Sequence, residues 1–374
     1  MKRSLPASLS AYLLFGAICY LSLFASSASA LPPPREGEAR FELTDKEPQV
    51  AEMFHLEPHT FRFKQTFQKT SSTAMEISLV TFPSPVTTPH EVNNTVHTEY
   101  FRPLSPGKHP GVIVLHILGG DFELSRLFCR QLAQNGVAAL FLKMPYYGER
   151  SPPGVKTRMI SDNAEDTVAG MRQAVLDIRR GAAFLASQPE IDPEQLGIFG
   201  ISLGGITTAL ASTAEPRFGK ICMMLAGGDM AKIAWESPEV ADVRTRWLAK
   251  GATKEQFYEA LKCIDPVTYG KNVRGRKMLM LNASHDEVIP KACTESLWHA
   301  FGEPEIVWMD AGHYSAMRFI FDGLTRVTKF FQPEKDKPTA SATSSAVEKP
   351  AAKPDADSAD QSAAEKPVAA PTNK

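Results

Sequence analysis

The sequence has almost no excess charge of either sign. Lysine and arginine number 41 and aspartate and glutamate 42 in a chain of 374 residues, so the formal net charge is -1. A near-neutral chain presents no basic field to a polyanion, and we therefore expect no nucleic-acid partner. Hydrophobic residues make up 43% of the chain, which is enough for the sizeable core of a globular protein.

Cysteine is also scarce, with five residues in the whole chain. Their spacings match no zinc pattern, and we expect neither a metal nor an organic cofactor. Cys222 lies in a strand-like apolar run and is predicted to be a buried thiol. Cys263 and Cys293 flank one predicted strand, and the sequence leaves open whether they form a disulfide or stay as free buried thiols.

Aromatic residues are absent after Phe331. Residues 333–374 are mainly Ala, Pro, Lys, Asp, Glu and Ser, and such a stretch cannot bury enough apolar surface to offset its ordering entropy. We therefore predict a disordered tail, with tethering to the cell envelope as one hypothesis for its role.

Residues 1–30 have the layout of a secretory signal peptide. Two basic residues precede an apolar run from Leu9 to Ala25, and a small-residue site ending at Ala30 follows. This layout predicts cleavage after Ala30 and export to the periplasm, the cell envelope or the medium. An uncleaved anchor is the alternative, because the run approaches the roughly 18 residues that cross a bilayer. The folded domain is expected over residues 31–332.

Two hydrophobic patterns divide this predicted domain. Between residues 39 and 101 apolar and polar positions alternate, which is typical of half-buried antiparallel strands. Farther along, helical patterns separate six continuous apolar runs, as expected for parallel strands covered on both faces. These runs are 112–115, 137–142, 196–199, 221–225, 278–281 and 306–308. The rhythm predicts an α/β protein with a mostly parallel central sheet, antiparallel N-terminal strands and helices on both faces.

The helical patterns between these runs have recognisable ends. Over residues 163–188 apolar residues recur at steps of three and four, with Asp162 or Asn163 as N-cap. A shorter helix is predicted over residues 124–134. The rhythm breaks at residues 229–272, a charged, aromatic and helical segment that we interpret as a small helical cap over the carboxyl edge of the sheet. An ordinary long crossover is the alternative.

The central motif is Gly200-Ile201-Ser202-Leu203-Gly204-Gly205, between a predicted strand and a helix-compatible stretch. A nucleophile elbow places its serine in a strained turn, so the residues two before and two after it must be small. The pattern alone is weak, and its place at a strand-to-helix junction gives it weight. It predicts Ser202 as a nucleophile, with the backbone N–H of Leu203 as one oxyanion donor.

A serine nucleophile needs a base, which this kind of sheet supplies from loops after later strands. Asp286 follows the fifth apolar run, and His313 follows the sixth. The order serine, aspartate, histidine is the order that α/β-hydrolases use. We therefore predict His313 as general base and Asp286 as the acid that orients it, with Glu287 and Asp310 as lesser candidates for the acid.

Two further loops are expected near the substrate. In the loop from His116 to Gly120 we predict the N–H of Ile117 as second oxyanion donor, although an ordinary glycine turn fits almost as well. The loop after the second apolar run carries Tyr147 and Arg150. We predict that Arg150 binds an anionic part of the substrate, with a solvent-facing arginine as the alternative. His116 and Tyr147 are predicted as further substrate contacts.

The sequence resembles the dienelactone hydrolase family of the α/β-hydrolases over roughly residues 108–331. Shared features are a histidine after a strand, a Pro-Tyr-Tyr-Gly loop, an elbow ending Leu-Gly-Gly, an Ile-Asp-Pro, and Asp-x-x-Ile-Pro followed by Gly-His-Tyr. The resemblance implies an α/β-hydrolase fold and carries the nucleophile, acid and base to Ser202, Asp286 and His313. Dienelactone-opening members use cysteine in the elbow, and Ile117 stands where they often have glutamate. Because of these two differences, the sequence is more similar to serine esterases of the same superfamily, including acetyl xylan esterase-like proteins, than to enzymes that open dienelactones.

These residues lead to the hypothesis of an exported serine hydrolase that cleaves a carboxylic ester through an acyl-enzyme. The substrate class is a small-molecule or carbohydrate-linked ester, and fold analogy does not identify it further. A peptidase acting on small peptides is the nearest alternative. A non-catalytic binding module of the cell envelope is the alternative from another class, and the complete serine, aspartate and histidine order argues against it.

Overall fold

A computed structural model of the protein describes residues 32–71, 74–120, 122–154 and 159–333. All of them belong to one compact unit that ends at Pro333. The predicted signal peptide and all but the first residue of the predicted tail lie outside these ranges. Among the helices within them, none has the length and hydrophobicity needed to span a bilayer.

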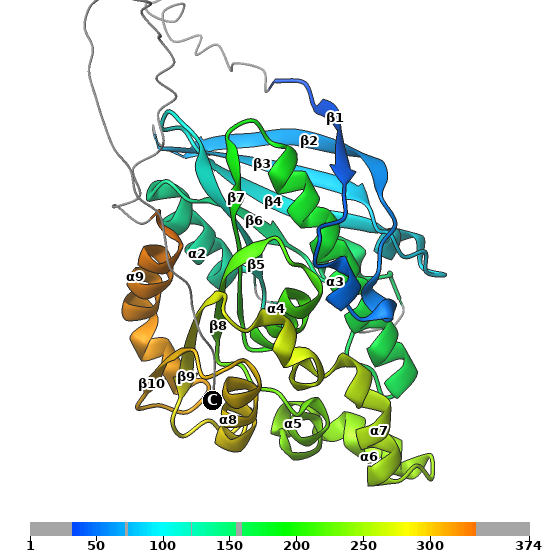
Figure 1. The fold of residues 1–374 in the computed structure, drawn as a ribbon. Coiled ribbons are helices and arrows are strands. Elements are labelled where there is room, and N and C mark those ends of the chain that lie inside the picture. Colours follow the sequence, from blue (N-terminus) through cyan, green and yellow to red (C-terminus); the bar gives the residue numbers. More distant parts are fainter. Residues whose placement is uncertain (1–31, 72–73, 121, 155–158, 334–374) are drawn as a thin grey trace, which may run out of the picture. The chain divides into compact units, whose positions relative to one another are not determined.

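Ten strands of the described chain form a single mixed sheet (Figure 1). They are β1 (Arg35–Phe41), β2 (His59–Ser71), β3 (Met75–Pro83), β4 (Thr95–Pro103), β5 (His109–Leu115), β6 (Ala138–Leu142), β7 (Ile191–Ile201), β8 (Phe218–Met224), β9 (Lys277–Ala283) and β10 (Glu305–Met309). Their order across the sheet is β1-β2-β3-β4-β6-β5-β7-β8-β9-β10. Strands β1 to β4 pair antiparallel, β4 also pairs antiparallel with β6, and all pairs from β6 to β10 are parallel.

Helices flank the sheet (Figure 1). The α-helices of the described residues are α2 (Glu123–Gln134), α3 (Ala164–Ser187), α4 (Leu203–Ala214), α5 (Met230–Glu236), α6 (Ala241–Ala249), α7 (Lys254–Leu261), α8 (Lys291–Ala300) and α9 (Ile320–Phe331). The 3₁₀ helices are η2 (Glu47–Gln49), η3 (Glu52–Phe54), η4 (Glu91–Asn94), η5 (Gly148–Arg150), η6 (Pro238–Val240), η7 (Lys262–Ile264), η8 (Pro266–Val273) and η9 (Ser315–Phe319).

The two halves of the sheet follow the two hydrophobic patterns. The alternating segment forms the antiparallel strands, the first of which begins at Arg35, before the pattern does. The six continuous runs form the parallel strands β5 to β10, as predicted. Strand β10 is an exception to the expected cover on both faces, because it lies at the sheet edge, and Trp308 there is 36% exposed. An edge strand has one neighbour, so fewer side chains shield it.

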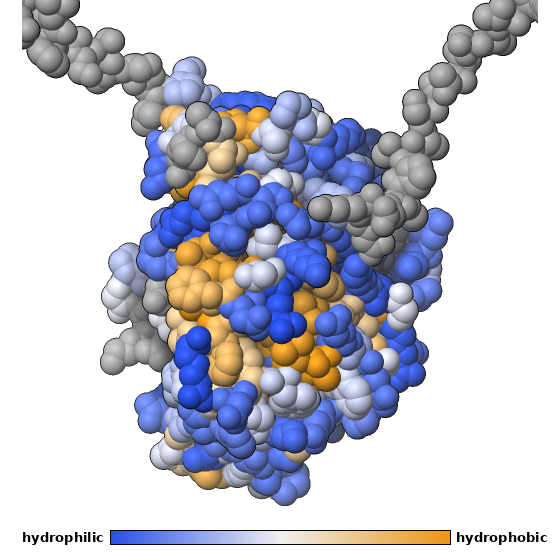
Figure 2. All heavy atoms as spheres, turned by 90° about the vertical axis from the view of Figure 1, so that its left-hand side faces the viewer, coloured by the Kyte–Doolittle hydropathy of each residue, from blue (hydrophilic) through white to orange (hydrophobic). Residues whose placement is uncertain are grey.

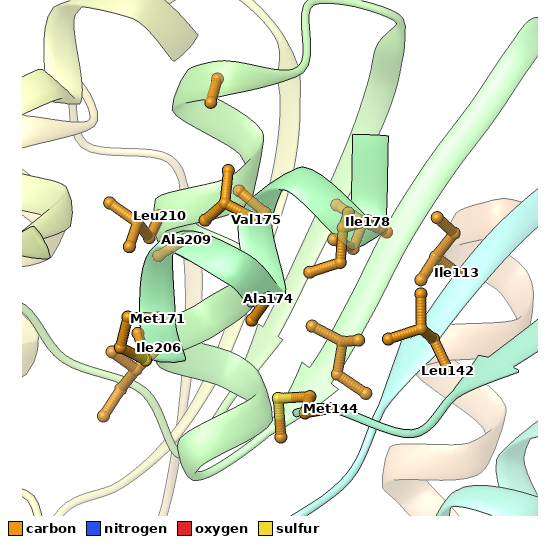
Figure 3. Packing of buried hydrophobic residues seen from close by; sticks show 14 of the residues in the cluster. Ile113, Leu142, Met144, Met171, Ala174, Val175, Ile178, Ile206, Ala209 and Leu210 are labelled. Atoms are coloured by element: carbon orange, nitrogen blue, oxygen red, sulfur yellow. The ribbon is translucent and has the colours of Figure 1, made fainter. Parts of the chain in front are cut away.

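Two hydrophobic clusters fill the space between the sheet and its helices. Successive side chains of a strand point to opposite faces, so Ile113 and Leu115 of β5 belong to one cluster and Val112 and Val114 to the other. The second cluster includes side chains of α2 and α9, and the first includes side chains of α3 and α4. Figure 3 shows part of the first cluster around α3 and α4, with Met171, Ala174, Val175, Ile178, Ile206, Ala209 and Leu210. The prediction that helices cover both faces of the sheet is confirmed, with the edge strand β10 as the exception.

Helix ends follow local capping chemistry. The side chain of Asn163 accepts a hydrogen bond from the backbone N–H of Glu165 at 3.0 Å, so Asn163 rather than Asp162 is the N-cap of α3. Helix α3 ends at Ser187, just before Pro189. The helix predicted over residues 124–134 is α2, which begins one residue earlier, at Glu123.

The segment over residues 229–272 is helical, as predicted, and contains α5, α6, α7 and most of η8. An aromatic cluster joins its helices, because the ring of Phe257 lies 5.8 Å from that of Trp235 and 5.2 Å from that of Trp247. Such ring pairs stabilise packing beyond the area that they bury. Phe257 belongs to the first hydrophobic cluster and the two tryptophans pack against it, so the segment is continuous with the core on that face of the sheet.

The four cysteines of the described residues are free thiols. Cys222 is buried, as predicted, and Cys293 is buried as well. The structure thus decides against a disulfide between Cys263 and Cys293. Burial raises the pKa of Cys293 to about 12, so this thiol stays protonated at neutral pH.

Candidate active site

Ser202 occupies a tight turn between β7 and α4. Its φ of 55° and ψ of -118° lie in a region that non-glycine residues rarely adopt. Its backbone N–H donates to the carbonyl oxygen of Met224 at 2.9 Å, which ties the turn to the end of β8. A Cβ on Gly200 would lie 2.2 Å from the carbonyl oxygen of Gly204, and a Cβ on Gly204 would lie 2.6 Å from that of His116. The two glycines are therefore required by close approach, as in a nucleophile elbow.

The imidazole of His313 joins Ser202 and Asp286. Its Nε2 lies 2.9 Å from the Oγ of Ser202, and its Nδ1 lies 2.8 and 3.0 Å from the two carboxylate oxygens of Asp286. An ionised carboxylate only accepts hydrogen bonds, so Nδ1 carries the proton and Nε2 is the acceptor for the serine hydroxyl. The fold brings together the three side chains that the sequence singled out, with Ser202 lying 111 residues and Asp286 27 residues before His313 in the chain.

The carboxylate of Asp286 is held in place by the backbone. One of its oxygens accepts the N–H groups of Val288 at 2.9 Å and Ile289 at 2.7 Å, and its side chain is 2% exposed. The acid is therefore positioned before any substrate binds. These bonds satisfy the carboxylate while the second oxygen faces the imidazole.

The two rival carboxylates have other partners. Glu287 accepts the backbone N–H of His313 at 2.8 Å, and Asp310 pairs with His285 at 3.0 Å in an exposed position. Asp286 is thus the one of the three that contacts the imidazole. The role of Glu287 in positioning the histidine loop was not predicted from the sequence. Its position next to Asp286 was the available sequence signal.

The two predicted oxyanion residues lie at the nucleophile. Ile117 and Leu203 line the same pocket as Ser202. Leu203 is the first residue of α4, where helix N–H groups have no intrahelical acceptor. The carbonyl oxygen of Ile117 accepts from Nδ1 of His116 at 2.8 Å and from the N–H of Gly120 at 3.3 Å. These two hydrogen bonds restrain the loop. That the backbone N–H groups of Ile117 and Leu203 are the oxyanion donors stays a prediction.

His116 supports this loop from the interior, so the prediction that it contacts substrate is wrong, whereas substrate contact by the half-buried Tyr147 stays a prediction. His116 is fully buried, and its Nε2 accepts the backbone N–H of Met144 at 3.1 Å. Its ring packs against that of Tyr147, with centroids 4.5 Å apart, and neither ring lines the pocket. Burial lowers the pKa of His116 to about 4, so the ring is neutral at pH 7. Its Nδ1–H then donates to the carbonyl of Ile117.

Arg150 lies in the interior, so both the predicted substrate contact and the solvent-facing alternative are wrong. The residue is fully buried, and its guanidinium pairs with Asp177 of α3 at 2.8 Å. It also donates to the carbonyl oxygens of Lys143 at 3.1 Å and Asn93 at 2.8 Å. Arg150 compensates the buried carboxylate of Asp177. Its positive charge is therefore not available to a substrate in the active site.

A pocket of about 350 Å³ opens beside Ser202 and His313. Most of its lining is apolar, and α5 and η6 contribute a wall that the sequence did not assign to the site. Among the described residues that line it there is no lysine or arginine, and Glu239 is the charged carboxylate. In the same ranges no group of three or more His, Cys, Asp or Glu side chains has an arrangement that could hold a metal ion.

Comparison with known proteins shows the family. The family model "Alpha/beta hydrolase domain containing 18" matches residues 41–234, more than half of the chain. The chain belongs to this α/β-hydrolase family. A model of the prolyl oligopeptidase family matches residues 171–333, which include the elbow and the histidine loop. General hydrolase activity is thus supported for this α/β-hydrolase.

Solved structures confirm the α/β-hydrolase fold. An acetyl xylan esterase from Paenibacillus sp. R4 is similar with a TM-score of 0.57 and 19% identity, over 71% of this chain and 88% of that chain. Acetyl xylan esterase 1 from Thermoanaerobacterium sp. JW/SL YS485 is similar with a TM-score of 0.55 and 19% identity, over 70% and 87% of the two chains. At these identities the likeness concerns the fold.

Two curated sequences are also similar to this α/β-hydrolase. Both are uncharacterized proteins of Mycobacterium tuberculosis, strains CDC 1551 / Oshkosh and ATCC 25618 / H37Rv, and each is 28% identical over 173 residues. The alignment covers 46% of this chain and 40% of the relatives' length. The similarity is therefore partial on both sides.

Proposed function

We propose that this α/β-hydrolase is a serine esterase that cleaves carboxylic esters through an acyl-enzyme. The observation that carries the proposal is the continuous contact from Ser202 through His313 to Asp286, with the serine in a strained elbow. Membership of a hydrolase family adds support. The contacts match the roles of nucleophile, base and orienting acid.

The proposed reaction follows from these contacts. Ser202 Oγ attacks the ester carbonyl carbon while Nε2 of His313 takes the hydroxyl proton. The negative charge on the carbonyl oxygen is stabilised by the N–H groups of Leu203 and Ile117. His313 then gives its proton to the alkoxide oxygen, and the ester C–O bond breaks. Water, deprotonated by His313, attacks the acyl-enzyme and releases the carboxylic acid and the serine. Throughout, Asp286 keeps the proton on Nδ1 and stabilises the imidazolium.

A peptidase is the second candidate, because the prolyl oligopeptidase model covers the elbow and both later loops. A peptide substrate needs partners for its backbone amides, whereas the pocket wall beside Ser202 is mostly apolar. This difference favours esters. Lactones that carry a carboxylate are disfavoured as well, because Arg150 is buried away from the pocket and Ser202 replaces the cysteine of dienelactone hydrolases.

Fluorophosphonate labelling and a panel of activated esters, amides and lactones test the proposal. Wild-type protein should be labelled at Ser202 and turn over esters. Ser202→Ala should abolish both signals, and His313→Ala should leave labelling very slow, because the hydroxyl is present but unactivated. Ser187→Ala, at an exposed serine of α3, is the matched control and should behave as wild type. Wild-type protein that neither labels nor hydrolyses any ester would establish the binding module instead.

We also propose export of the protein, with the tail over residues 333–374 as an envelope tether. Support comes from the layout of residues 1–30 and the composition of the tail. Amino-terminal sequencing of protein from the cell envelope should start at Leu31. An intact Met1 on that protein would instead support the uncleaved anchor.

A further inference from the structure

The side chains that line the pocket beside Ser202 differ in exposure. Ile206, Met224 and Met230 are 3–6% exposed, as are other apolar side chains of the lining, and we call this buried part of the pocket its closed end. Tyr314 and Met317 line the pocket too, but they are 57% and 52% exposed. The second pair therefore marks the side on which the pocket meets solvent.

This asymmetry assigns the two halves of an ester. In an acyl-enzyme mechanism the acyl group stays bonded to Ser202 while the alcohol departs and water arrives. The departing alcohol needs a path to solvent, which the side of Tyr314 and Met317 offers. The acyl group has no such need, and the closed apolar end can hold it until water attacks.

The closed end offers no positive charge to an anionic acyl group, and its polar side chain is that of Ser237. The hydroxyl oxygen of Ser237, a residue that is 2% exposed, accepts the backbone N–H of Glu239 at 3.3 Å. The carboxylate of Glu239 accepts the hydroxyl of Tyr314. Among the described lining residues no lysine or arginine is present to pair with an anion. A carboxylate placed there would lose its hydration without compensation. Glu239, which contacts Tyr314 on the open side, would repel a carboxylate at the entrance.

The size and rim of the pocket also favour an apolar substrate. Its volume of about 350 Å³ is within the range of small-molecule sites, and an acetyl group would leave most of it unfilled. Figure 2 shows hydrophobic residues gathered on the face that carries α9. Tyr314 and Met317, which line the open side of the pocket, present mostly carbon atoms and are more than half exposed. The rim is thus partly apolar, which disfavours a sugar as leaving group.

We propose that the substrates are neutral esters whose acyl part is an apolar chain of medium length, held in the closed end of the pocket. The inference rests on the proposed ester hydrolysis and narrows it. It also predicts that acetyl esters are poor substrates, because an acetyl group would leave most of the closed end unfilled. Met230, Ile233 and Ala234 of α5 then become specificity residues of the acyl site.

A series of p-nitrophenyl esters tests the inference on wild-type protein. From acetate through butanoate and hexanoate to octanoate, kcat/KM should rise about fourfold per added methylene while the chain stays within the pocket. The hemisuccinate should be at least about tenfold slower than the butanoate, because it carries a carboxylate. An acetate that reacts fastest, or a hemisuccinate that reacts as fast as the butanoate, would overturn the inference.

A substitution in α5 links the preference to this pocket. Ala234→Phe fills the wall, and the ratio of kcat/KM for octanoate to that for acetate should fall at least about tenfold. Ala249→Phe, at an exposed position of α6 in the same segment, is the matched control and should keep the wild-type ratio. An unchanged ratio in Ala234→Phe would overturn the assignment of the acyl site.

Fluorophosphonate labelling distinguishes failure of the proposed esterase function from failure of the acyl-chain inference. Protein that labels at Ser202 but prefers acetate retains the proposed esterase function and loses the acyl-chain inference. Protein that shows no labelling and no turnover loses both. Labelling together with rising rates along the series supports both.

Discussion

Both carboxylate oxygens of Asp286 lie within hydrogen-bond distance of Nδ1 of His313, at 2.8 and 3.0 Å. The next residue, Glu287, accepts the backbone N–H of the same histidine at 2.8 Å. One carboxylate thus sets the tautomer of the imidazole, and its neighbour sets the position of the loop. The two contacts lead to different expectations for substitution.

Asp286→Asn should reduce kcat by about 10⁴, the loss that the corresponding change causes in a chymotrypsin-type triad, because the amide can hold the imidazole in the wrong tautomer. Asp310→Asn is the matched control and should stay near wild type, since Asp310 is exposed and pairs with His285. Steady-state turnover of an activated ester, with circular dichroism as a check of folding, measures both. A reversed pattern would show that the acid has been assigned to the wrong residue.

Gly200→Ala should disable the elbow, because a Cβ there would lie 2.2 Å from the carbonyl oxygen of Gly204. Overpacking against backbone costs about 1–3 kcal/mol of unfolding free energy or more, and it should also displace Ser202 and slow fluorophosphonate labelling. Gly219→Ala in β8 provides the comparison, since its Cβ would meet only the carbonyl of Leu196, at 3.9 Å. Equal labelling and stability of the two variants would contradict the prediction.

Arg150→Ala should lower the free energy of unfolding by about 3–5 kcal/mol, because it leaves the buried carboxylate of Asp177 with the Ser84 hydroxyl but without its cationic partner. The exposed pair of Arg326 and Asp322 in α9 gives the control, and Arg326→Ala should cost less than about 1 kcal/mol. Urea unfolding monitored by tryptophan fluorescence gives both values. Similar losses in the two variants would refute the structural role assigned to Arg150.

His116 should make the stability of the protein depend on pH. Its folded-state pKa of about 4 lies below the unfolded value of 6.5, so between these values the unfolded chain binds a proton that the folded chain does not. Stability from this group is therefore present above about pH 7 and is lost as the pH falls. From pH 7.5 to pH 5 the loss should be about 2 kcal/mol.

His116→Gln isolates this contribution, because glutamine offers an acceptor for the N–H of Met144 and does not titrate. The variant will be less stable than wild type at pH 7.5, but its free energy of unfolding should change less on acidification. Urea unfolding at the two pH values gives the comparison. Parallel pH profiles of the two proteins would show that His116 is not the group responsible.

Much of the fold and the core of the site could be predicted from the sequence. Strand types, the bounds of α3 and the elbow all depend on residues that are neighbours in the chain. An alternation of two marks a half-buried strand, and small residues two positions either side of Ser202 mark its turn. The chain order then restricted the base to His313 and the acid to a few carboxylates in two loops.

Only the tertiary structure decided among candidates that share the same local signals. Asp286, Glu287 and Asp310 all follow strands, and the paths of two loops determine which carboxylate meets the imidazole. Arg150 was predicted to bind substrate, with a solvent-facing position as the alternative, because its partner Asp177 lies 27 positions away in a helix and gives no local signal. The pocket wall is assembled from segments between Ile117 and Ile320. Local hydrogen bonding and side-chain periodicity are set by neighbours in the chain, whereas burial and partnership depend on which distant segments pack together.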